Sequence, residues 1–251
     1  MHLGRPARLA GMIERQVEVT TPDGEMTTFV FHPEHGGPHP VVLYLMDAPS
    51  IRPALKDMAS RLATAGYYVM LPYLFYRGGP YREFGMSDED MHARQELMGQ
   101  INPTNIVSDA EALLAHADGD AAAREGKVGV VGFCMSGGLA VSLARALPER
   151  VAAAASIHGA WLVRDTDDSP HLGLDAVEAE LHFAWCDNDP TAPAADRTTM
   201  EQALADADVT YSLDFHPDAV HGFAPAGPRY DRAASELHWE RVHSLLRRNV
   251  E

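Results

Sequence analysis

The sequence predicts an α/β fold with a mostly parallel, doubly wound sheet of eight strands that an antiparallel hairpin opens. Two observations carry this prediction. Residues 14–31 alternate polar and apolar side chains around Pro22-Asp23-Gly24, which is the turn chemistry of a hairpin. After the hairpin, six short apolar runs, typical of buried parallel strands, are separated in most cases by stretches with helical periodicity. Strands that alternate with helices build parallel sheets covered on both faces.

The expected elements follow one another without a long linker or an internal repeat, so we expect one domain over residues 1–251. The strands after the hairpin are expected at Val41–Met46, Tyr67–Leu71, Lys127–Phe133, Val151–Ile157, Glu180–Trp185 and Val209–Phe215. The helices are expected at Pro53–Ala65, Ser87–Met98, Asn105–His116, Gly137–Leu147, Ala194–Ala207 and Arg232–Arg248. In such a sheet, catalytic side chains lie on loops at the carboxyl ends of the strands.

Composition excludes several classes of partner. The chain has 36 acidic and 20 basic residues, a net charge of −16 and no basic cluster, which argues against nucleic acid. It has no apolar run of 18 residues, and its N-terminus lacks the apolar segment of a signal peptide, so we expect no membrane partner. Two cysteines, Cys134 and Cys186, cannot form a disulfide framework. We therefore expect reduced thiols and a cytoplasmic location.

The segment KVGVVGFCMSGGLA predicts a buried strand, a tight turn and a helix, in the pattern of a nucleophile elbow. A nucleophile on such a turn has a strained backbone, and Gly132 before Cys134 and the small residues 136–138 after it leave room for that strain. The N-terminus of the following helix also favours a reactive thiolate. The pattern predicts Cys134 as the nucleophile, with Ser136 as the alternative.

A thiol that attacks an ester needs a base, and the base needs an acceptor that orients it. Downstream of the elbow, one predicted strand leads into a loop with Asp187 and Asp189, and the last predicted strand leads into a loop with His216 and His221. The order nucleophile, acid, histidine is that of hydrolases with a nucleophile elbow. We prefer His221 over His216 because a glycine follows it; spacing alone leaves both aspartates open.

The chain resembles the dienelactone hydrolases of the α/β-hydrolase superfamily over nearly its whole length. The resemblance lies in the elbow and, in the family's order, in Met46-Asp47-Ala48-Pro49, Ser169-Pro170-His171, Asp189-Pro190, His221-Gly222-Phe223 and Glu236-Leu237-His238-Trp239. It implies the α/β-hydrolase fold and hydrolysis of a small ester or lactone through a thioester on Cys134. It favours Asp189 as the acid, because the family's Asp-x-x-x-Pro pattern falls on Asp189 and Pro193.

The expected oxyanion hole consists of the backbone N–H of Met135, after the nucleophile, and by resemblance that of Ala48. Asp47 stands where the family has a glutamate that keeps the resting thiol neutral. The resemblance therefore implies that the carboxylate of Asp47 approaches Cys134.

The resemblance also bears on substrate recognition. Arg77 matches a family arginine that holds the carboxylate of the substrate, whereas Pro225 replaces the second such arginine, which favours a less charged ester. We expect Tyr76 and Phe223 beside the substrate. His158, which follows a predicted strand, is a further candidate for the pocket.

No cofactor is predicted. The chain contains neither GxGxxG nor GxxxxGK[ST], and the glycines and proline between His35 and His39 break the helical spacing of a metal site. Two further hypotheses stay open: an esterase or thioesterase that uses Ser136, and a catalytically silent binding module with the same fold. We expect a monomer or a homodimer.

Overall fold

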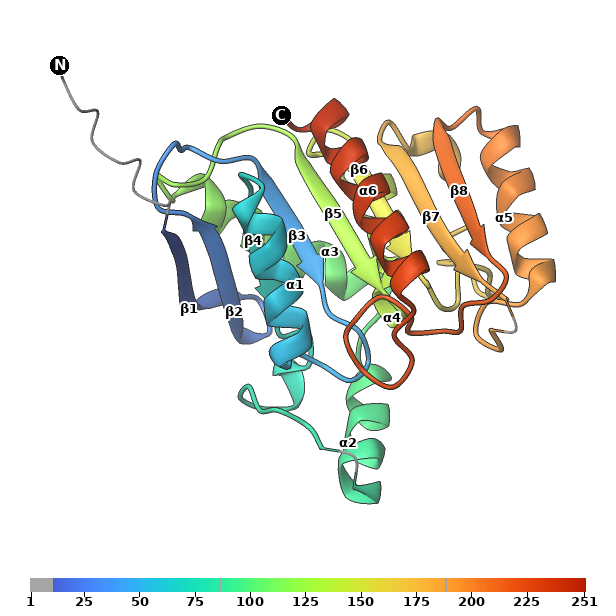
Figure 1. The fold of residues 1–251 in the computed structure, drawn as a ribbon, viewed down its shortest axis with the longest axis horizontal. Helices are drawn as coiled ribbons and strands as arrows, with labels where there is room; N and C mark the ends of the chain where they lie inside the picture. The colour runs from blue at the N-terminus through green and yellow to red at the C-terminus, as the bar shows by residue number, and fades with distance from the viewer. Residues whose placement is uncertain (1–10, 86, 188) are drawn as a thin grey trace, which may run out of the picture.

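A computed structural model describes residues 11–85, 87–187 and 189–251 of the chain. Their eight strands form one sheet in the order β1-β2-β4-β3-β5-β6-β7-β8 (Figure 1). The strands are β1 (Met12–Thr21), β2 (Gly24–Pro33), β3 (Val41–Leu45), β4 (Tyr68–Pro72), β5 (Val128–Phe133), β6 (Val151–Ile157), β7 (Glu180–Cys186) and β8 (Tyr211–His216). Strands β3 to β8 pair in parallel, and β2 pairs antiparallel with both β1 and β4, which confirms the predicted sheet.

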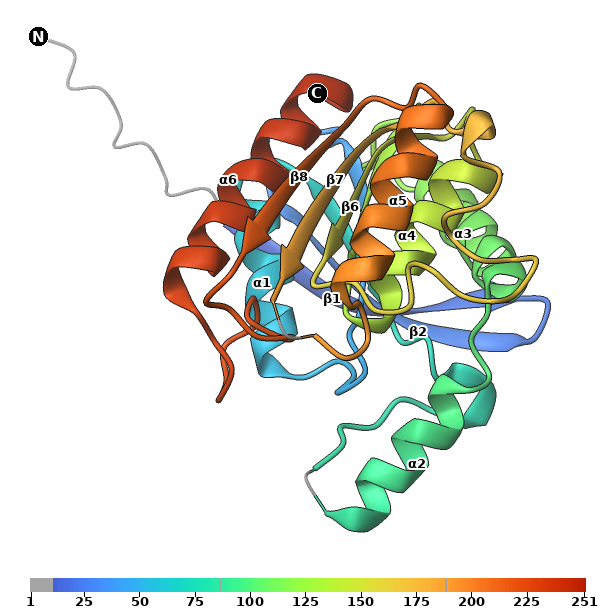
Figure 2. The ribbon, with the colours of Figure 1, turned by 90° about the vertical axis from the view of Figure 1, so that its right-hand side faces the viewer.

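Helices cover both faces of this sheet. Helices α1 and α6 lie on one face and α3, α4 and α5 on the other, so the sheet is doubly wound (Figure 2). The helices are α1 (Pro53–Thr64), α2 (Asp88–Met98), α3 (Pro103–Asp118), α4 (Met135–Ala146), α5 (Ala194–Asp206) and α6 (Arg232–Asn249). Strands β3, β4 and β5 are buried along their whole length, which explains why they read as continuous apolar runs.

Two helices begin at an earlier residue than the sequence predicts. Helix α4 begins at Met135, directly after Cys134, and not at Gly137. Helix α3 begins at Pro103, because the side chain of Asn102 accepts hydrogen bonds from the first turn in a capping box. The early start of α4 places the nucleophile candidate at the very end of β5.

Helix α2 stands apart from the two helix layers. It projects from the side of the molecule toward which the parallel strands point (Figures 1 and 2), and none of its described residues is buried. Ser87 caps its first turn by accepting a hydrogen bond from the backbone of Asp90. Helix α2 therefore lies at the edge of the sheet where catalytic loops are expected.

None of the described helices is long and apolar enough to cross a membrane. The prediction that the N-terminus carries no signal peptide rests largely on residues 1–10. These lie outside the described residues.

Candidate active site

Cys134 occupies the turn between β5 and α4. Its backbone has φ 53° and ψ −118°, in the left-handed half of conformational space that side chains other than glycine rarely adopt. The turn is also closely packed, because a Cβ on Gly132 would overlap the backbone carbonyl of Ser136. This is the local geometry of a nucleophile elbow, which lifts the side chain above the sheet.

The loops after β5, β7 and β8 bring together Cys134, Asp189 and His221. The Nε2 atom of His221 lies 3.0 Å from the Sγ atom of Cys134, and its Nδ1 atom lies 2.6 Å from Oδ2 of Asp189. Cys134 is half-buried, whereas the side chain of Asp189 is only 1% exposed. The geometry is that of a nucleophile, a base and an orienting acid.

Thr191 is a member of this site that the sequence analysis missed. Its backbone N–H and its hydroxyl donate to Oδ1 of Asp189 at 2.8 and 2.6 Å, which leaves Oδ2 for His221. The sequence carried a signal for this contact, because an aspartate side chain commonly accepts a hydrogen bond from the backbone N–H two residues further on.

The rival residues lie elsewhere. The ring of His216 packs against Phe223 with centroids 5.0 Å apart, and the backbone N–H of Asp187 donates to the carbonyl of His216. Ser136, the alternative nucleophile, is fully buried, and its hydroxyl donates to the carbonyl of Met46 at 2.6 Å.

The electrostatics of the site favour an ion pair between Asp189 and His221. Burial disfavours the charged carboxylate, but hydrogen bonds from His221 and Thr191 outweigh it and lower the pKa of Asp189 to about 2. Burial also disfavours the imidazolium, but hydrogen bonds to Asp189 and Cys134 outweigh it and raise the pKa of His221 to about 10. A protonated His221 then presents its Nε2–H to the sulfur.

The carboxylate of Asp47 is buried and has a charged partner. It accepts two hydrogen bonds from the guanidinium of Arg52, at 2.5 and 2.8 Å. Burial raises the pKa of Asp47, and Arg52 and the charge of His221 oppose that shift. Asp47 therefore lies within electrostatic reach of His221, and its approach to the thiol of Cys134 stays a prediction.

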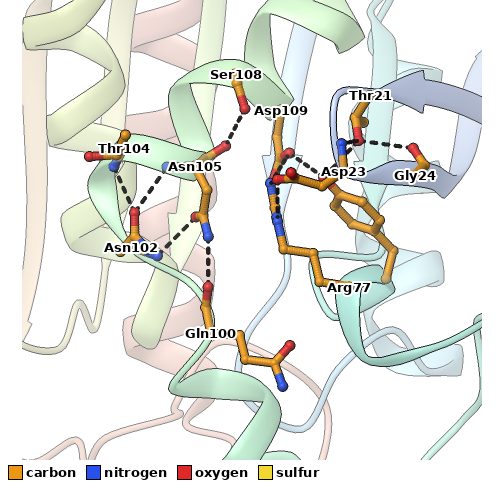
Figure 3. Close-up of polar contacts among 11 residues, drawn as sticks. Thr21, Asp23, Gly24, Arg77, Gln100, Asn102, Thr104, Asn105, Ser108 and Asp109 are labelled. Atoms are coloured by element: carbon orange, nitrogen blue, oxygen red, sulfur yellow. Dashed lines mark hydrogen bonds and ion pairs between the residues drawn. The ribbon is translucent and has the colours of Figure 1, made fainter.

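Tyr76 and Arg77 are both engaged in contacts that hold the fold together, and Figure 3 shows the guanidinium of Arg77 against Asp109. The guanidinium of Arg77 binds both carboxylate oxygens of Asp109 at 2.8 and 2.9 Å, and its Nε donates to Asp23 at 2.8 Å. The hydroxyl of Tyr76 donates to Asp109 at 2.7 Å and lies 2.8 Å from that of Thr21. The two residues thus join α3 to the β1–β2 hairpin, and the donors of Arg77 are not free for a substrate carboxylate.

His158 and Phe223 do not line a substrate pocket either. They are 1% and 0% exposed, respectively. The ring of His158 lies behind that of His221, with centroids 5.2 Å apart, and Phe223 packs edge-on against His158 at the same distance. Burial lowers the pKa of His158 well below the ordinary histidine value, so this ring is a neutral support for His221.

The two N–H groups expected to bind an oxyanion belong to segments that one hydrogen bond joins. Met135 opens α4, where the first N–H groups have no partner within the helix. Ala48 follows β3 by three residues, on the loop that Ser136 binds through the Met46 carbonyl. Among the described residues, no group of three or more His, Cys, Asp or Glu side chains could hold a metal ion.

A model of the dienelactone hydrolase family matches residues 26–250 of this chain. The chain belongs to the dienelactone hydrolase family. Among similar members, a “Putative carboxymethylenebutenolidase” of Synechocystis is 29% identical over 226 residues, which cover 88% of this chain and 91% of the relative. A carboxymethylenebutenolidase of Rhodococcus opacus is 25% identical over 235 residues, which cover 91% of this chain and 88% of the relative.

Solved structures agree with this family assignment at the level of the fold. A dienelactone hydrolase of Anabaena variabilis superposes with a TM-score of 0.65 at 19% identity, and covers 96% of this chain and 99% of its own. A dienelactone hydrolase-like promiscuous phosphotriesterase from metagenomic libraries reaches a TM-score of 0.79 at 20% identity, with coverage of 96% and 99%. This family member therefore has the α/β-hydrolase fold.

The Asp189–His221 pair makes stability depend on pH. The contribution of Asp189 is complete above its ordinary pKa of 3.8 and is lost as the pH falls toward 2, whereas that of His221 is complete below 6.5 and is lost as the pH rises toward 10. Asp189→Asn should therefore lower the melting temperature most between pH 3.8 and 6.5, by about 5 °C. Thermal unfolding at a series of pH values measures this gap.

Asp218→Asn is the matched control, because Asp218 is exposed on the same loop as His221. It should change the melting temperature little at any pH. An Asp189→Asn gap that stays constant from acid to alkaline pH would contradict the ion pair.

Arg77→Ala should lower the free energy of unfolding by about 3 kcal/mol, because it leaves the buried carboxylate of Asp109 without its charged partner. The ratio of kcat/KM between a substrate with a carboxylate and its methyl ester should not change. Urea unfolding and steady-state kinetics give the two values.

Arg82→Ala is the control. It removes a pair with Asp90 in which the arginine is mostly exposed, and should lower the free energy of unfolding by less than about 1 kcal/mol. A selective loss of activity on the acid substrate would restore Arg77 as a substrate anchor.

Proposed function

We propose that this chain is a single-domain carboxylic ester and lactone hydrolase in which Cys134, His221 and Asp189 form the catalytic triad. The observation that carries the proposal is the continuous contact from the sulfur of Cys134 through the imidazole of His221 to Asp189, at the end of an elbow. The carboxymethylenebutenolidase names of its relatives support a lactone or ester as the substrate class.

The reaction would have two halves. The sulfur of Cys134 attacks the carbonyl carbon while its proton resides on Nε2 of His221, and the oxyanion accepts hydrogen bonds from the N–H groups of Met135 and Ala48. His221 then protonates the leaving alcohol, and the acyl group stays bound to Cys134 as a thioester. A water molecule gives a proton to His221 and attacks the thioester, which releases the acid and restores the sulfur of Cys134 beside a protonated His221.

In this scheme Asp189 keeps the imidazole in one orientation and stabilises its charged form. Thr191 fixes the carboxylate of Asp189 from the opposite side, and the ring of His158 supports His221 from behind. These three residues are positioning residues. They determine the direction of the Nε2 atom without touching the substrate.

The two other hypotheses receive less support. The hydroxyl of Ser136 is buried and bound to a backbone carbonyl, so it would have to leave that bond before it could attack an ester. A silent binding module would have no need of a thiol, an imidazole and a carboxylate in hydrogen-bonding order.

The biological setting that fits this chemistry is the cytoplasm, because the proposed nucleophile must be a reduced thiol. The substrate would be a small molecule and neither a nucleic acid nor a membrane, given the net charge of −16. A monomer or a homodimer would serve, because all three triad residues come from one chain.

Treatment with an activated ester, followed by mass spectrometry of peptides, should reveal an acyl group on Cys134. Cys134→Ala should abolish this adduct and lower kcat/KM by about 10⁴-fold or more, since it removes the nucleophile. Ser136→Ala, a change of similar size two residues away, should keep the adduct. An adduct on Ser136 would support the serine esterase, and no adduct on either residue would contradict covalent catalysis at this turn.

A matched pair of an acid and its methyl ester tests the charge of the substrate. The neutral ester should have the higher kcat/KM of the pair, because the acid lacks the bidentate arginine contacts of the family, each worth about 2 kcal/mol or about thirtyfold in rate. Comparison of kcat/KM for the pair measures this preference. A preference for the acid would contradict it, and Arg229→Ala would then identify the anchor, because Arg229 is exposed beside His221 and donates to its backbone carbonyl at 3.4 Å.

A further inference from the structure

We propose that a groove beside Met135 binds a short, uncharged aliphatic chain of the substrate, an inference that rests on ester hydrolysis at Cys134. The groove lies between the end of α2, the start of α4 and the loop after β6. Its apolar walls are formed mainly by Met98, Ile101, Met135, Leu139, Trp161 and Pro170. We call this surface the aliphatic groove.

The groove starts within one residue of the proposed nucleophile. Met135 follows Cys134 directly and belongs to the lining. Ala160, also in the lining, donates its backbone N–H to the carbonyl of Cys134 at 2.8 Å. The groove therefore begins beside the turn that carries Cys134, and the proposal places one group of the ester in it.

The wall on the opposite side is fixed to the acid of the triad. The backbone N–H of Trp161 donates to the carbonyl of Thr191 at 2.9 Å, and Thr191 in turn holds Asp189. Trp161 has φ 54°, a strained value for a bulky residue, and its side chain is 43% exposed. An exposed aromatic residue in a backbone held this way is a common feature of ligand sites.

Most polar atoms of the lining are already engaged. The Asn102 amide oxygen accepts from the first turn of α3, and the Ser142 hydroxyl donates to the carbonyl of Gly138. Arg164 forms an ion pair with Asp168 at 2.7 Å, so it leaves no net positive charge at the groove, and its buried Nε has no hydrogen-bond partner among the described residues. A charged group would lose water here without a free counter-charge, whereas an apolar chain would gain from burial.

The size of the groove favours a chain over a ring. Its cavity volume is about 50 Å³. A cavity that holds benzene measures about 150 Å³. At Gly138 the wall has no side chain, and a Cβ there would lie 3.0 Å from Cγ of Pro170, so a single methyl group would narrow the space.

The experiment measures kcat/KM for two ester series. In one series the acyl chain varies from acetate through butyrate to octanoate, with benzoate as the ring; in the other the alcohol varies in the same way. In one of the two series, the wild type should prefer the four-carbon chain over the two-carbon chain by about tenfold, since each buried CH₂ contributes about 0.8 kcal/mol. The same series should show a lower rate for the ring.

Two variants should shift this profile in opposite directions. Gly138→Ala should lower the ratio of kcat/KM for the four-carbon chain to that for the two-carbon chain toward one; alanine is also the better helix former, so the fold should be kept. Trp161→Ala should widen the groove and move the maximum toward octanoate or benzoate. Phe215→Ala is the control, because Phe215 is a similarly exposed aromatic residue, 41% against 43%, outside the groove lining. It should keep the wild-type profile.

The outcomes separate the two proposals. If Cys134 is acylated but both series are flat and neither groove variant changes them, the aliphatic groove is overturned and the hydrolase stands. If no ester acylates Cys134, the proposed function fails, and the groove fails with it.

Discussion

Cys134 can hold its left-handed backbone only because three neighbouring segments hold it there. Its N–H donates to the carbonyl at the end of β6, and its own carbonyl accepts from the N–H groups of Gly137 and Ala160. The closely packed glycines of this turn remove the side chains that would push the segments apart. The strain at the nucleophile is thus balanced by hydrogen bonds from the central strands and from the loop that lines the aliphatic groove.

A second constraint is the pairing of buried charges. Asp189 with His221, Asp47 with Arg52 and Asp109 with Arg77 each place a carboxylate that is nearly or fully buried against one cation. A chain with a net charge of −16 has few cations to spare, and a buried carboxylate without a partner would be costly. Arg77, the arginine expected to recognise an anionic substrate, is therefore used inside the protein, which agrees with the proposed preference for neutral esters.

The sequence predicted the parts of the site that depend on local pattern and topology. Strand ends determine where catalytic loops meet, so the apolar runs predicted that the loops with the two aspartates and the two histidines converge on Cys134. The choice of Asp189 came from the family resemblance, and that of His221 from the glycine after it. The turn residues of the hairpin and the alternation of strands with helices likewise predicted the sheet. Burial of Tyr76, His158 and Phe223 could not be predicted, because it depends on which long-range neighbours cover a loop.

The sequence could not predict the partners of the charged side chains either. A position matched to the family says that an aspartate stands near the nucleophile, but not that Arg52 will pair with its carboxylate. Arg77 shows the same limit. Its partner Asp109 lies 32 positions away on α3, and no local pattern connects them.

Ser136 links two segments that matter for the proposed reaction. Its hydroxyl donates to the carbonyl of Met46, so helix α4 is tied to the loop that carries Ala48. The two N–H groups proposed to bind the oxyanion, those of Met135 and Ala48, lie on the two segments that this bond joins. Because a tetrahedral oxyanion is stabilised only when both donors already point to one place, a buried hydrogen bond between their segments would serve the proposed reaction without touching the substrate. Ser136, the alternative nucleophile, is therefore better placed to hold these two segments together than to attack a substrate.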